Sequence, residues 1–499
     1  YFFQGIIDDV RVYNRALSQS EIQTDMNTPV GGTTDITPPS ITITTPTANP
    51  TFTTSTSPLT LGGTAADNIG VTQVTWSNSL GGSGTAAGTT SWTASGIVLQ
   101  PGSNVLTVTA RDAANNTGTA TLTVTYSSGG ALSFAPAVSL PSGTNTHGGK
   151  VVDINGDGKL DLVAANAGSS TASVWLGNGD TTFGTRADFP TGLTPKMVAV
   201  GDLNGAGKLD LVSANQSDAT VSVLLGNGAG GFGAKVDYAA CTGTHEVALG
   251  DLNGDGALDA IAACWGGSVV SVWLGNGNGT LRPKVDYGAG DGPHSVILGR
   301  FDADLFLDAA VANLGSNTVS ILRGNGNGTF QTQVTYAVGT NPHSLRSGDL
   351  NGDGRLDLVT ANEGSNNVSV LLGNGDGTFQ GAVNYPTGLV PKGVAIADVS
   401  GDGRPDVITA NTAGNYPVCC FSGGNQISVL LGSGTGTLGA PVSFTTGLTP
   451  FAVATGDLDG DGDLDVVTAN WDSNDVTVLK NLTTGGTTDT TLPSITITT

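Results

Sequence analysis

The sequence predicts an all-β fold whose main part is a seven-bladed β-propeller. Three observations carry this prediction: a motif that recurs at a constant interval, four short strand-like segments in each interval, and the composition. Of the 499 residues, 76 are glycine and only 12% are charged. Such a composition suits short strands and tight turns rather than helices.

An acidic motif, Asp-x-Asn-Gly-Asp-Gly-x-Leu-Asp, recurs through most of the chain beyond residue 150. Its copies begin at Asp153, Asp202, Asp251, Asp349, Asp398 and Asp457, and a degenerate copy begins at Arg300. Five of the six steps between copies span 49 residues, and the step that contains an insertion at 415–424 spans 59. A fixed period of this length indicates one supersecondary unit per copy.

Each repeat unit has the pattern of four short strands separated by turn residues. In the second unit the strand-like segments are 195–202, 209–215, 220–225 and 232–238. Four strands per unit are typical of a propeller blade. The seventh unit ends after its third strand, near Leu479, whereas residues 132–140 match an outer strand. We therefore expect the segment around Phe134 to complete the seventh blade and close the ring.

The first strand of each unit alternates bulky and small residues. In the second unit Val198 and Val200 occupy one face, and Ala199 and Gly201 occupy the other. Successive side chains of a strand point to opposite faces, so one blade can pack its bulky face onto the small face of its neighbour.

The acidic loops have the donor pattern of a calcium site, since calcium takes six to eight oxygen ligands in a flexible cage. Positions one, three, five and nine supply side-chain oxygens, position seven supplies a backbone carbonyl, and glycines at positions four and six permit a tight turn. The candidate ligands are Asp153, Asn155, Asp157, Lys159 and Asp161; Asp251, Asn253, Asp255, Ala257 and Asp259; Asp349, Asn351, Asp353, Arg355 and Asp357; Asp398, Ser400, Asp402, Arg404 and Asp406; and Asp457, Asp459, Asp461, Asp463 and Asp465.

The loops differ in how complete this pattern is. We expect four calcium ions in the first, third, fifth and seventh loops, and a weaker fifth in the sixth loop, where Ser400 stands at position three. The second loop has alanine at position five and keeps only Asp202, Asn204 and Asp210, and the fourth is expected to bind no metal. The alternative is that the Asp-Gly and Asn-Gly pairs are simply hairpin turns. That alternative leaves the clustered carboxylates unexplained, because they repel one another without a cation. Magnesium fits less well, since it demands strict octahedral geometry.

All four histidines fall at one repeat position, six residues before the loop start. In the seven units this position holds His147, Lys196, His245, His294, His343, Lys392 and Phe451. Because it begins the innermost strand, these side chains are expected to circle the channel end opposite the acidic loops. They can receive a carboxylate, a sulfate or a transition metal. The favoured alternative is that repeat duplication copied a packing residue. If the ring binds an anion, imidazoles that titrate near pH 6.5 predict an affinity that rises from about pH 8 to about 5.5.

Two cysteine pairs lie at the same end of the predicted blades as the histidines. Cys241 and Cys264 fall in the third unit, where a disulfide and two free thiols are both compatible with the sequence. Cys419 and Cys420 are adjacent in the insertion, and Cα atoms about 3.8 Å apart would strain a bridge between them.

The charge balance and the motifs exclude several functions. The chain has 18 basic and 41 acidic residues, a net charge of −23. We expect no nucleic-acid partner, because phosphate contacts need clustered Lys and Arg. No apolar run is long enough for a membrane span. No Ser/His/Asp set, zinc motif or phosphate loop is present, so we predict no catalytic residues and no enzymatic activity.

Residues 131–482 resemble the FG-GAP/VCBS repeat family, whose propeller also forms the head of integrin α subunits. The resemblance rests on the acidic loops and on the segment Leu-Gly-Asn-Gly-Asp-Gly-Thr-Phe at 372–379 with its copies. It implies a calcium-stabilised extracellular module for adhesion or binding, with a protein or glycan ligand on the face opposite the calcium loops. Rim aromatics such as Trp265, Trp471 and Tyr416 favour the alternative of a lectin-like module, although such aromatics more commonly fill gaps between blades. A further alternative is a non-catalytic part of a polysaccharide-active enzyme.

The segments before the propeller resemble two other β modules. Residues 1–27 resemble the C-terminal piece of a laminin-G-like jelly roll, through the sequence Gly-Ile-Ile-Asp-Asp-Val-Arg-Val-Tyr-Asn-Arg-Ala-Leu at 5–17. Residues 37–127 resemble a bacterial Ig-like β-sandwich, and residues 28–36 are expected to be a linker.

The entry to the Ig-like segment is duplicated at the end of the sequence. GGTTDITPPSITITT at 31–45 returns as GGTTDTTLPSITITT at 485–499. We therefore expect residues 483–499 to be a linker and the first strand of a second Ig-like domain in a longer modular array. Such an array is expected to be secreted or displayed on a bacterial cell surface, and its terminal strand could pair with another molecule.

Overall fold

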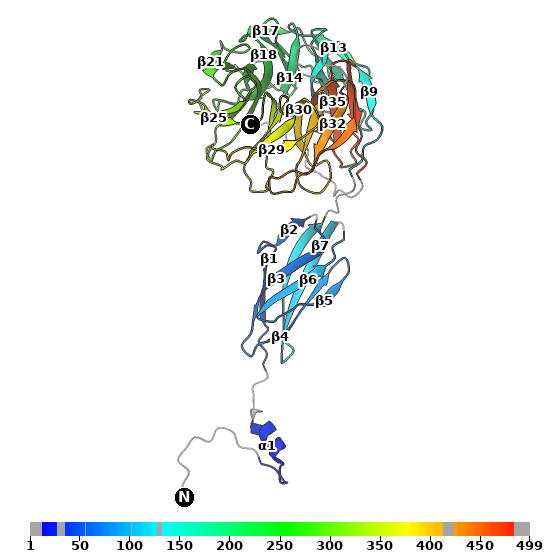
Figure 1. Ribbon diagram of the computed structural model, residues 1–499, viewed down its shortest axis with the longest axis vertical. Coiled ribbons are helices and arrows are strands. Elements are labelled where there is room, and N and C mark those ends of the chain that lie inside the picture. Colours follow the sequence, from blue (N-terminus) through cyan, green and yellow to red (C-terminus); the bar gives the residue numbers. More distant parts are fainter. Residues whose placement is uncertain are drawn as a thin grey trace. The chain divides into compact units, whose positions relative to one another are not determined.

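The computed structural model describes residues 12–26, 35–54, 56–100, 102–126, 132–412 and 424–483. The chain divides into two compact units, residues 1–126 and 127–499, and both consist mainly of strands (Figure 1). Several expectations lie wholly or partly outside the described residues: the jelly-roll piece at 1–27, the insertion with Cys419, Cys420 and Tyr416, and the linker and first strand at 483–499.

A short helix, α1 (Gln19–Met26), precedes the first sheets. Its first turn is held by a capping box. The backbone N–H of Ser18 donates to the Glu21 carboxylate at 2.8 Å, and the Glu21 N–H donates to the Ser18 hydroxyl at 3.4 Å. The sequence analysis did not identify this helix, although Ser-x-x-Glu at 18–21 is a signature of a helix N-terminus.

Residues 40–126 form two sheets packed face to face. One has the order β1 (Ser40–Thr45), β3 (Leu59–Ala66), β6 (Ser91–Ile97); the other has the order β2 (Thr51–Thr54), β8 (Thr117–Tyr126), β7 (Gly102–Asp112), β4 (Val71–Asn78), β5 (Ser83–Thr85). Leu61, Trp92 and Ile97 from the first sheet meet Leu106 and Leu122 from the second, all with at most 1% of their surface exposed. This unit is therefore a β-sandwich with its own apolar core.

The second unit contains seven four-stranded antiparallel sheets among its described residues, as the repeat predicts. The first strands are β10 (Thr146–Val152), β14 (Pro195–Gly201), β18 (Thr244–Gly250), β22 (Pro293–Gly299), β26 (Pro342–Gly348), β30 (Pro391–Ala397) and β34 (Pro450–Gly456). The second strands are β11 (Asp161–Asn166), β15 (Asp210–Asn215), β19 (Asp259–Cys264), β23 (Asp308–Asn313), β27 (Asp357–Asn362), β31 (Asp406–Asn411) and β35 (Asp465–Asn470).

The third and fourth strands complete each sheet. The third strands are β12 (Thr171–Trp175), β16 (Thr220–Leu224), β20 (Val269–Trp273), β24 (Thr318–Leu322), β28 (Asn367–Leu371), β32 (Gln426–Leu430) and β36 (Asp475–Leu479). The fourth, outer strands are β13 (Ala187–Pro190), β17 (Val236–Ala239), β21 (Val285–Gly288), β25 (Val334–Ala337), β29 (Val383–Pro386), β33 (Val442–Thr445) and, for the seventh sheet, β9 (Val138–Pro141).

The two ends of the second unit join in one sheet, which closes the ring. Strand β9 pairs with β36, and Phe134 forms a further bridge with Asn481. Each first strand contacts the first strand of the next sheet, and β34 in turn contacts β10. The prediction that the segment around Phe134 completes the last sheet is confirmed. The seven sheets form the closed ring of a β-propeller.

The sheets pack bulky face onto small face, as the first strands predict. A Cβ added at Gly201 would lie 2.7 Å from a methyl of Leu258 and 3.2 Å from one of Leu249, both from the next sheet. A Cβ added at Gly456 in the last sheet would lie 2.7 Å from a methyl of Val151 in the first. The small residues therefore make room for the bulky side chains of the neighbour all the way around the ring.

A glycine–asparagine corner recurs at the end of the second strand in six of the seven sheets. At the second sheet, Asn215 donates to the hydroxyls of Ser222 at 2.8 Å and Thr220 at 3.0 Å, and a Cβ on Gly192 would lie 2.5 Å from its Nδ2. The pairs are Gly143–Asn166, Gly192–Asn215, Gly290–Asn313, Gly339–Asn362, Gly388–Asn411 and Gly447–Asn470. In the third sheet both positions are cysteine, and Cys241 and Cys264 form a disulfide. The covalent bond therefore replaces a hydrogen-bonded corner.

Replacing the two cysteines with the glycine and asparagine of the other sheets tests whether the disulfide substitutes for the glycine–asparagine corner. Cys264→Asn alone places an amide against the Cys241 Cβ, whereas adding Cys241→Gly makes room for it. We expect the double variant to be more stable than Cys264→Asn alone by about 1–3 kcal/mol, because the overpacking is relieved. Denaturant unfolding of the two single variants and the double variant measures this coupling. A double variant no more stable than Cys264→Asn would show that the two positions act independently.

Candidate functional site

The acidic loops connect the end of each first strand to the start of the second strand. In the first loop, one oxygen of Asp153 accepts the N–H of Gly156 and the other accepts the N–H of Gly158, both at 2.8 Å. These glycines have φ values of 75° and 83°, a left-handed conformation that favours glycine. The carboxylate at position one thus organises the loop backbone around itself, as it also does in the loops that begin at Asp251 and Asp349.

The aspartate at position nine has a structural role in every sheet. In the first sheet, Asp161 accepts the N–H of Ile154 at 2.9 Å and the N–H of Gly177, in the turn after the third strand, at 2.7 Å. The equivalent residues are Asp161, Asp210, Asp259, Asp308, Asp357, Asp406 and Asp465, all 0% exposed and all accepting two such bonds. The sequence analysis assigned position nine to metal binding alone, but Asp308 makes the same bonds in the degenerate fourth loop.

Burial raises the pKa of these position-nine carboxyls. It raises the pKa of Asp406 and Asp465 to about 7, and that of Asp259 and Asp308 to about 6. Asp308 shows this rise in the loop that is expected to hold no metal. The elevated pKa therefore reports desolvation of a structural carboxyl and is not by itself an indication of a metal site.

The seventh loop brings three carboxylates together. Oxygens of Asp457, Asp459 and Asp461 lie within 4.8 Å of one another, and Oδ1 of Asp459 is buried without a hydrogen-bond partner. Lys480 contacts Asp459 and lies 3.4 Å from Asp461. An orphaned carboxylate oxygen inside an acidic group fits a hard cation. In the other six loops, all within the described part of the chain, no three carboxylates converge this closely.

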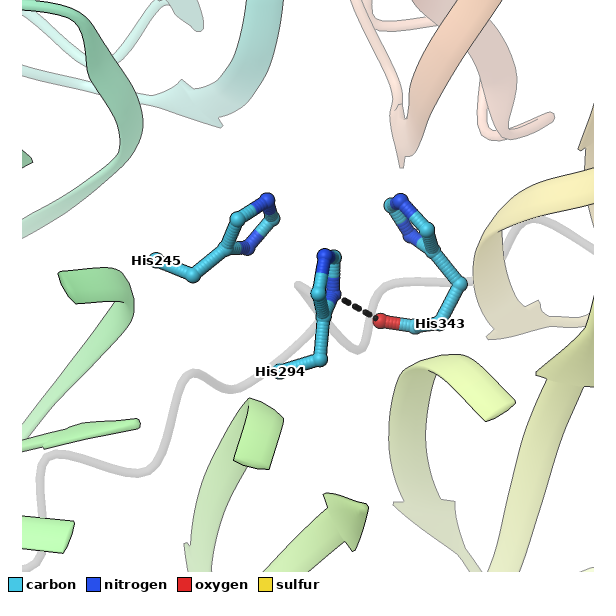
Figure 2. A group of neighbouring side chains, drawn as sticks. All are labelled: His245, His294 and His343. Atoms are coloured by element: carbon cyan, nitrogen blue, oxygen red, sulfur yellow. Dashed lines mark hydrogen bonds between the residues drawn. The ribbon is translucent and has the colours of Figure 1, made fainter. Parts of the chain in front are cut away.

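The histidine position forms a compact buried group at the other end of the first strands. His147, His245, His294 and His343 have exposed fractions of only 3–7%. The ring centroids of His245 and His294 lie 3.5 Å apart, and those of His294 and His343 lie 4.0 Å apart (Figure 2). The sequence analysis expected these residues to circle the channel mouth, and the structure brings them into direct contact.

Aromatic and cationic side chains complete this group. The ring of Phe451 lies 4.6 Å from that of His147 and 5.3 Å from that of Trp471. Nζ of Lys196 lies 4.7 Å from the centre of Trp471, which is a cation–π contact. Lys392 pairs with Glu363, and both side chains are buried. Glu363 was missed from the sequence because it follows the second strand of the preceding unit.

The burial of the histidines gives them a different titration from the one that the sequence analysis expects. Burial lowers the pKa of all four imidazoles, and that of His294 to about 3, with a smaller contribution from the charge of Lys392. These four imidazoles are therefore neutral between pH 5.5 and 8. The positive charges at this end are the lysines, and burial lowers the pKa of Lys196 to about 8. Affinity for an anion would thus fall as the pH rises through about 8.

A second charged group lies along the axis of the ring. A cavity of about 620 Å³ is lined by first strands and holds Lys150, Glu246 and Arg346. Arg346 donates to Glu246 at 3.2 Å, and burial lowers the pKa of Lys150 to about 8. The sequence analysis missed all three residues. The available signal was that charged residues interrupt the small-residue face of the first strands.

The remaining candidates are placed as follows. Trp265 is 52% exposed and follows the second strand of the third sheet, at the histidine end. Trp471 packs into the histidine group instead. Within the described part of the chain, no helix is long and apolar enough to cross a membrane.

Titration of the histidines tests the buried geometry. We expect the imidazole Cε1–H resonances to keep neutral chemical shifts from pH 8 to 5.5. Below about pH 6.5 the unfolded chain binds protons that the folded chain does not, so the free energy of unfolding falls with pH. The loss at pH 5.5 is about 1 kcal/mol per histidine. Histidine titration curves by NMR measure the pKa values, and a midpoint near 6.5 in the folded protein would contradict the buried arrangement.

The fold also has counterparts among solved structures. BBS1N in complex with ARL6DN, from a mercury-soaked crystal, matches with a TM-score of 0.50 at 12% identity over 71% of this chain and 98% of its own. A protein from Lactobacillus plantarum matches with a TM-score of 0.46 at 15% identity, over 77% and 98% of the two chains. The periplasmic gluconolactonase PpgL of Pseudomonas aeruginosa matches with a TM-score of 0.44 at 18% identity, over 69% and 93%. At these identities the likeness is one of fold alone.

Among curated proteins, no sequence matches this chain. A family model, described as an FG-GAP-like repeat, matches residues 153–213, 202–262, 300–360, 349–409 and 418–468, together more than half of the chain. Four of these segments begin at motif starts, including the degenerate one at Arg300, which agrees with the repeat register. The chain therefore belongs to the family of FG-GAP-like repeat proteins.

Proposed function

We propose that this chain is a calcium-stabilised extracellular binding module of a larger modular protein, with its ligand on the histidine end of the propeller. The observation that carries the proposal is the difference between the two ends of the first strands. One end repeats a nearly uniform acidic loop, whereas the other differs from sheet to sheet. Binding residues tend to lie on variable segments that a rigid fold positions.

Calcium is proposed for the first, third, fifth and seventh loops, with a weaker site in the sixth. The seventh loop supports this most directly, because Asp457, Asp459 and Asp461 converge and Asp459 Oδ1 has no partner. In the first, third and fifth loops the carboxylate at position one accepts the N–H of position five, which folds the acidic residues into one turn. Calcium supplies the positive charge that offsets the repulsion between these carboxylates.

The variable end offers several features for recognition. Trp265 is exposed there, and Lys196 carries a positive charge in an acidic protein. In the sequence, the insertion at 415–424 follows the second strand of the sixth unit. A protein ligand is favoured over a glycan, because BBS1N, a propeller of similar fold, is in a complex with a protein. A lectin-like module is the second candidate, favoured by the exposed Trp265, since an aromatic ring can stack on a sugar face.

The location and the neighbouring modules follow from the same proposal. The Cys241–Cys264 disulfide supports an oxidising compartment outside the cytoplasm. The sandwich of residues 40–126 is proposed to be an Ig-like spacer, and residues 1–27 and 483–499 parts of adjoining modules. The converging carboxylates of the propeller are assigned to calcium, so no catalytic role is proposed for them.

Removal of calcium tests the metal assignment. A calcium chelator should lower the melting temperature by more than about 10 °C, and added calcium should restore it, because the ion binds only the folded loops. Asp353→Asn should remove one bound calcium, whereas Asp304→Asn, at the same position of the fourth loop, should remove none. Both side chains accept a local backbone N–H, at 2.9 and 2.8 Å, so the pair is matched. Calcium counting by isothermal titration calorimetry distinguishes them, and equal counts in the two variants would contradict the assignment.

Two exposed apolar residues test which end binds the ligand. We expect Trp265→Ala to weaken binding at least about tenfold, as for an aromatic anchor at an interface, and Leu305→Ala, on the exposed fourth loop, to leave it unchanged. A protein pull-down beside a glycan array identifies the ligand class, and surface plasmon resonance then measures the two variants. Loss of binding with Leu305→Ala alone would place the ligand on the loop end. Turnover of uronic-acid polymers would show an enzyme instead.

A further inference from the structure

We propose that His245, His294 and His343 form a site for one transition metal ion of the zinc class. The three residues come from the adjacent strands β18, β22 and β26, and one ring nitrogen of each lies within 4.8 Å of the others. Figure 2 shows the three rings side by side, with His294 between the other two. This site is independent of the calcium loops, which lie at the opposite ends of the same strands.

The ring nitrogens of the three histidines lie near the spacing that a tetrahedral ion needs. Zinc–imidazole bonds of about 2.0–2.1 Å place neighbouring donor nitrogens about 3.3 Å apart. One ring nitrogen of each histidine lies within 4.8 Å of those of the other two, so the nitrogens must approach one another by up to about 1.5 Å. The rings of His245 and His294, whose centroids lie 3.5 Å apart, must also turn so that both nitrogens face one ion.

The central imidazole already has the tautomer that a metal ligand requires. Nδ1 of His294 lies 2.8 Å from the backbone oxygen of His343, and because a carbonyl only accepts, this nitrogen carries the proton. Nε2 of His294 is then left with its lone pair. At metal sites, a ligating histidine commonly donates its other ring N–H to a carboxylate or a backbone carbonyl, which fixes the orientation of the ring. Among the described residues, no hydrogen bond is made by the ring nitrogens of His245 or His343.

The charge state and the surroundings select the type of ion. The three imidazoles are buried, with exposed fractions of 5–7%, and imidazole binds metal in its neutral form. Imidazole donors suit zinc, copper, nickel and cobalt, whereas calcium and magnesium prefer oxygen. Lys196 and Lys392 oppose a cation, but Lys392 is paired with Glu363. Three protein ligands leave a fourth coordination position for water or for an anionic group.

His147 provides a matched control within the same ring. It occupies the same repeat position, is 3% exposed, and its Nδ1 lies 3.1 Å from the backbone oxygen of Lys196. It does not belong to the group of converging nitrogens. Its ring centroid lies 5.0 Å from that of His245 and 6.4 Å from that of His343. His147 is the one histidine of the four outside the converging group. Loss of metal affinity in His294→Gln but not in His147→Gln would therefore report loss of a ligand rather than loss of packing.

The experiment is a cobalt and zinc titration of the tag-free chain in excess calcium, with Cys419 and Cys420 replaced by serine. We expect one cobalt ion per chain with the intense visible absorption of tetrahedral coordination, displaced by zinc, and a rise in melting temperature with zinc. His294→Gln should lower the zinc affinity at least about 100-fold, measured against a chromophoric chelator, and His147→Gln should leave it unchanged. His245→Gln should behave like His294→Gln.

Any of three other results would overturn the proposal. No cobalt spectrum after overnight equilibration would show that the imidazoles only pack. Equal loss of affinity in His294→Gln and His147→Gln would show that the effect is structural, and the melting temperatures without zinc identify a folding defect. If His245→Gln and His294→Gln both leave the cobalt spectrum unchanged, the cobalt ion is not bound by these imidazoles and lies elsewhere. A negative result leaves the calcium assignment and the binding function untouched, because both rest on other residues.

Discussion

A buried aspartate at the start of each second strand ties the propeller together. It accepts one N–H from the loop that precedes it and one from the turn after the third strand, so a single carboxylate connects three segments of a sheet. The same two hydrogen bonds occur in all seven sheets. Their N···O distances are 2.9 and 2.7 Å for Asp161 and 3.1 and 2.8 Å for Asp308. Burying this group costs free energy, as the raised pKa shows, and the two hydrogen bonds offset that cost. The acidic loops are thus anchored at their last residue whether or not a cation is present.

The closed ring forces one repeat position into a crowded core. Seven side chains that begin the first strands must share the space around one end of the axis. They are four imidazoles, the ring of Phe451 and two lysines, and Trp471 packs against them. Neutral histidines suit this place because they pack like aromatic rings, and the backbone oxygen of the next sheet satisfies a ring nitrogen of His147 and of His294. Lys392 can be buried there only because Glu363 pairs with it. The same crowding that stabilises the ring also brings three nitrogen donors together.

Much of this structure could be predicted from periodicity. The constant spacing fixed the strand order, the alternation in β14 indicated the inter-sheet packing, and the unpaired segment near Phe134 revealed the closure. The charge states could not be predicted, because they depend on burial in the assembled ring: the histidines occupy the expected position but do not titrate as exposed imidazoles do. The group of Lys150, Glu246 and Arg346 was missed for a related reason. The Arg346–Glu246 ion pair joins residues 100 positions apart, and Lys150 lines the same cavity from the first sheet, so no local pattern encodes the group. The helix α1 was missed although its capping box is local.

The fourth loop shows what the acidic pattern adds to the fold. It lacks the glycines and the first aspartate, and it exposes Leu305 (78%) and Phe306 (44%) instead. Its sheet is nevertheless complete, with β22 to β25 in the same order and register as the others. The strands therefore do not depend on a cation in every sheet, and the left-handed glycines and clustered carboxylates of the other loops are not requirements of the ring itself. The strands alone therefore do not explain the presence of these residues in the other loops at a cost in charge repulsion. The seventh loop, with its unpartnered Asp459 oxygen, is where that cost is most visible.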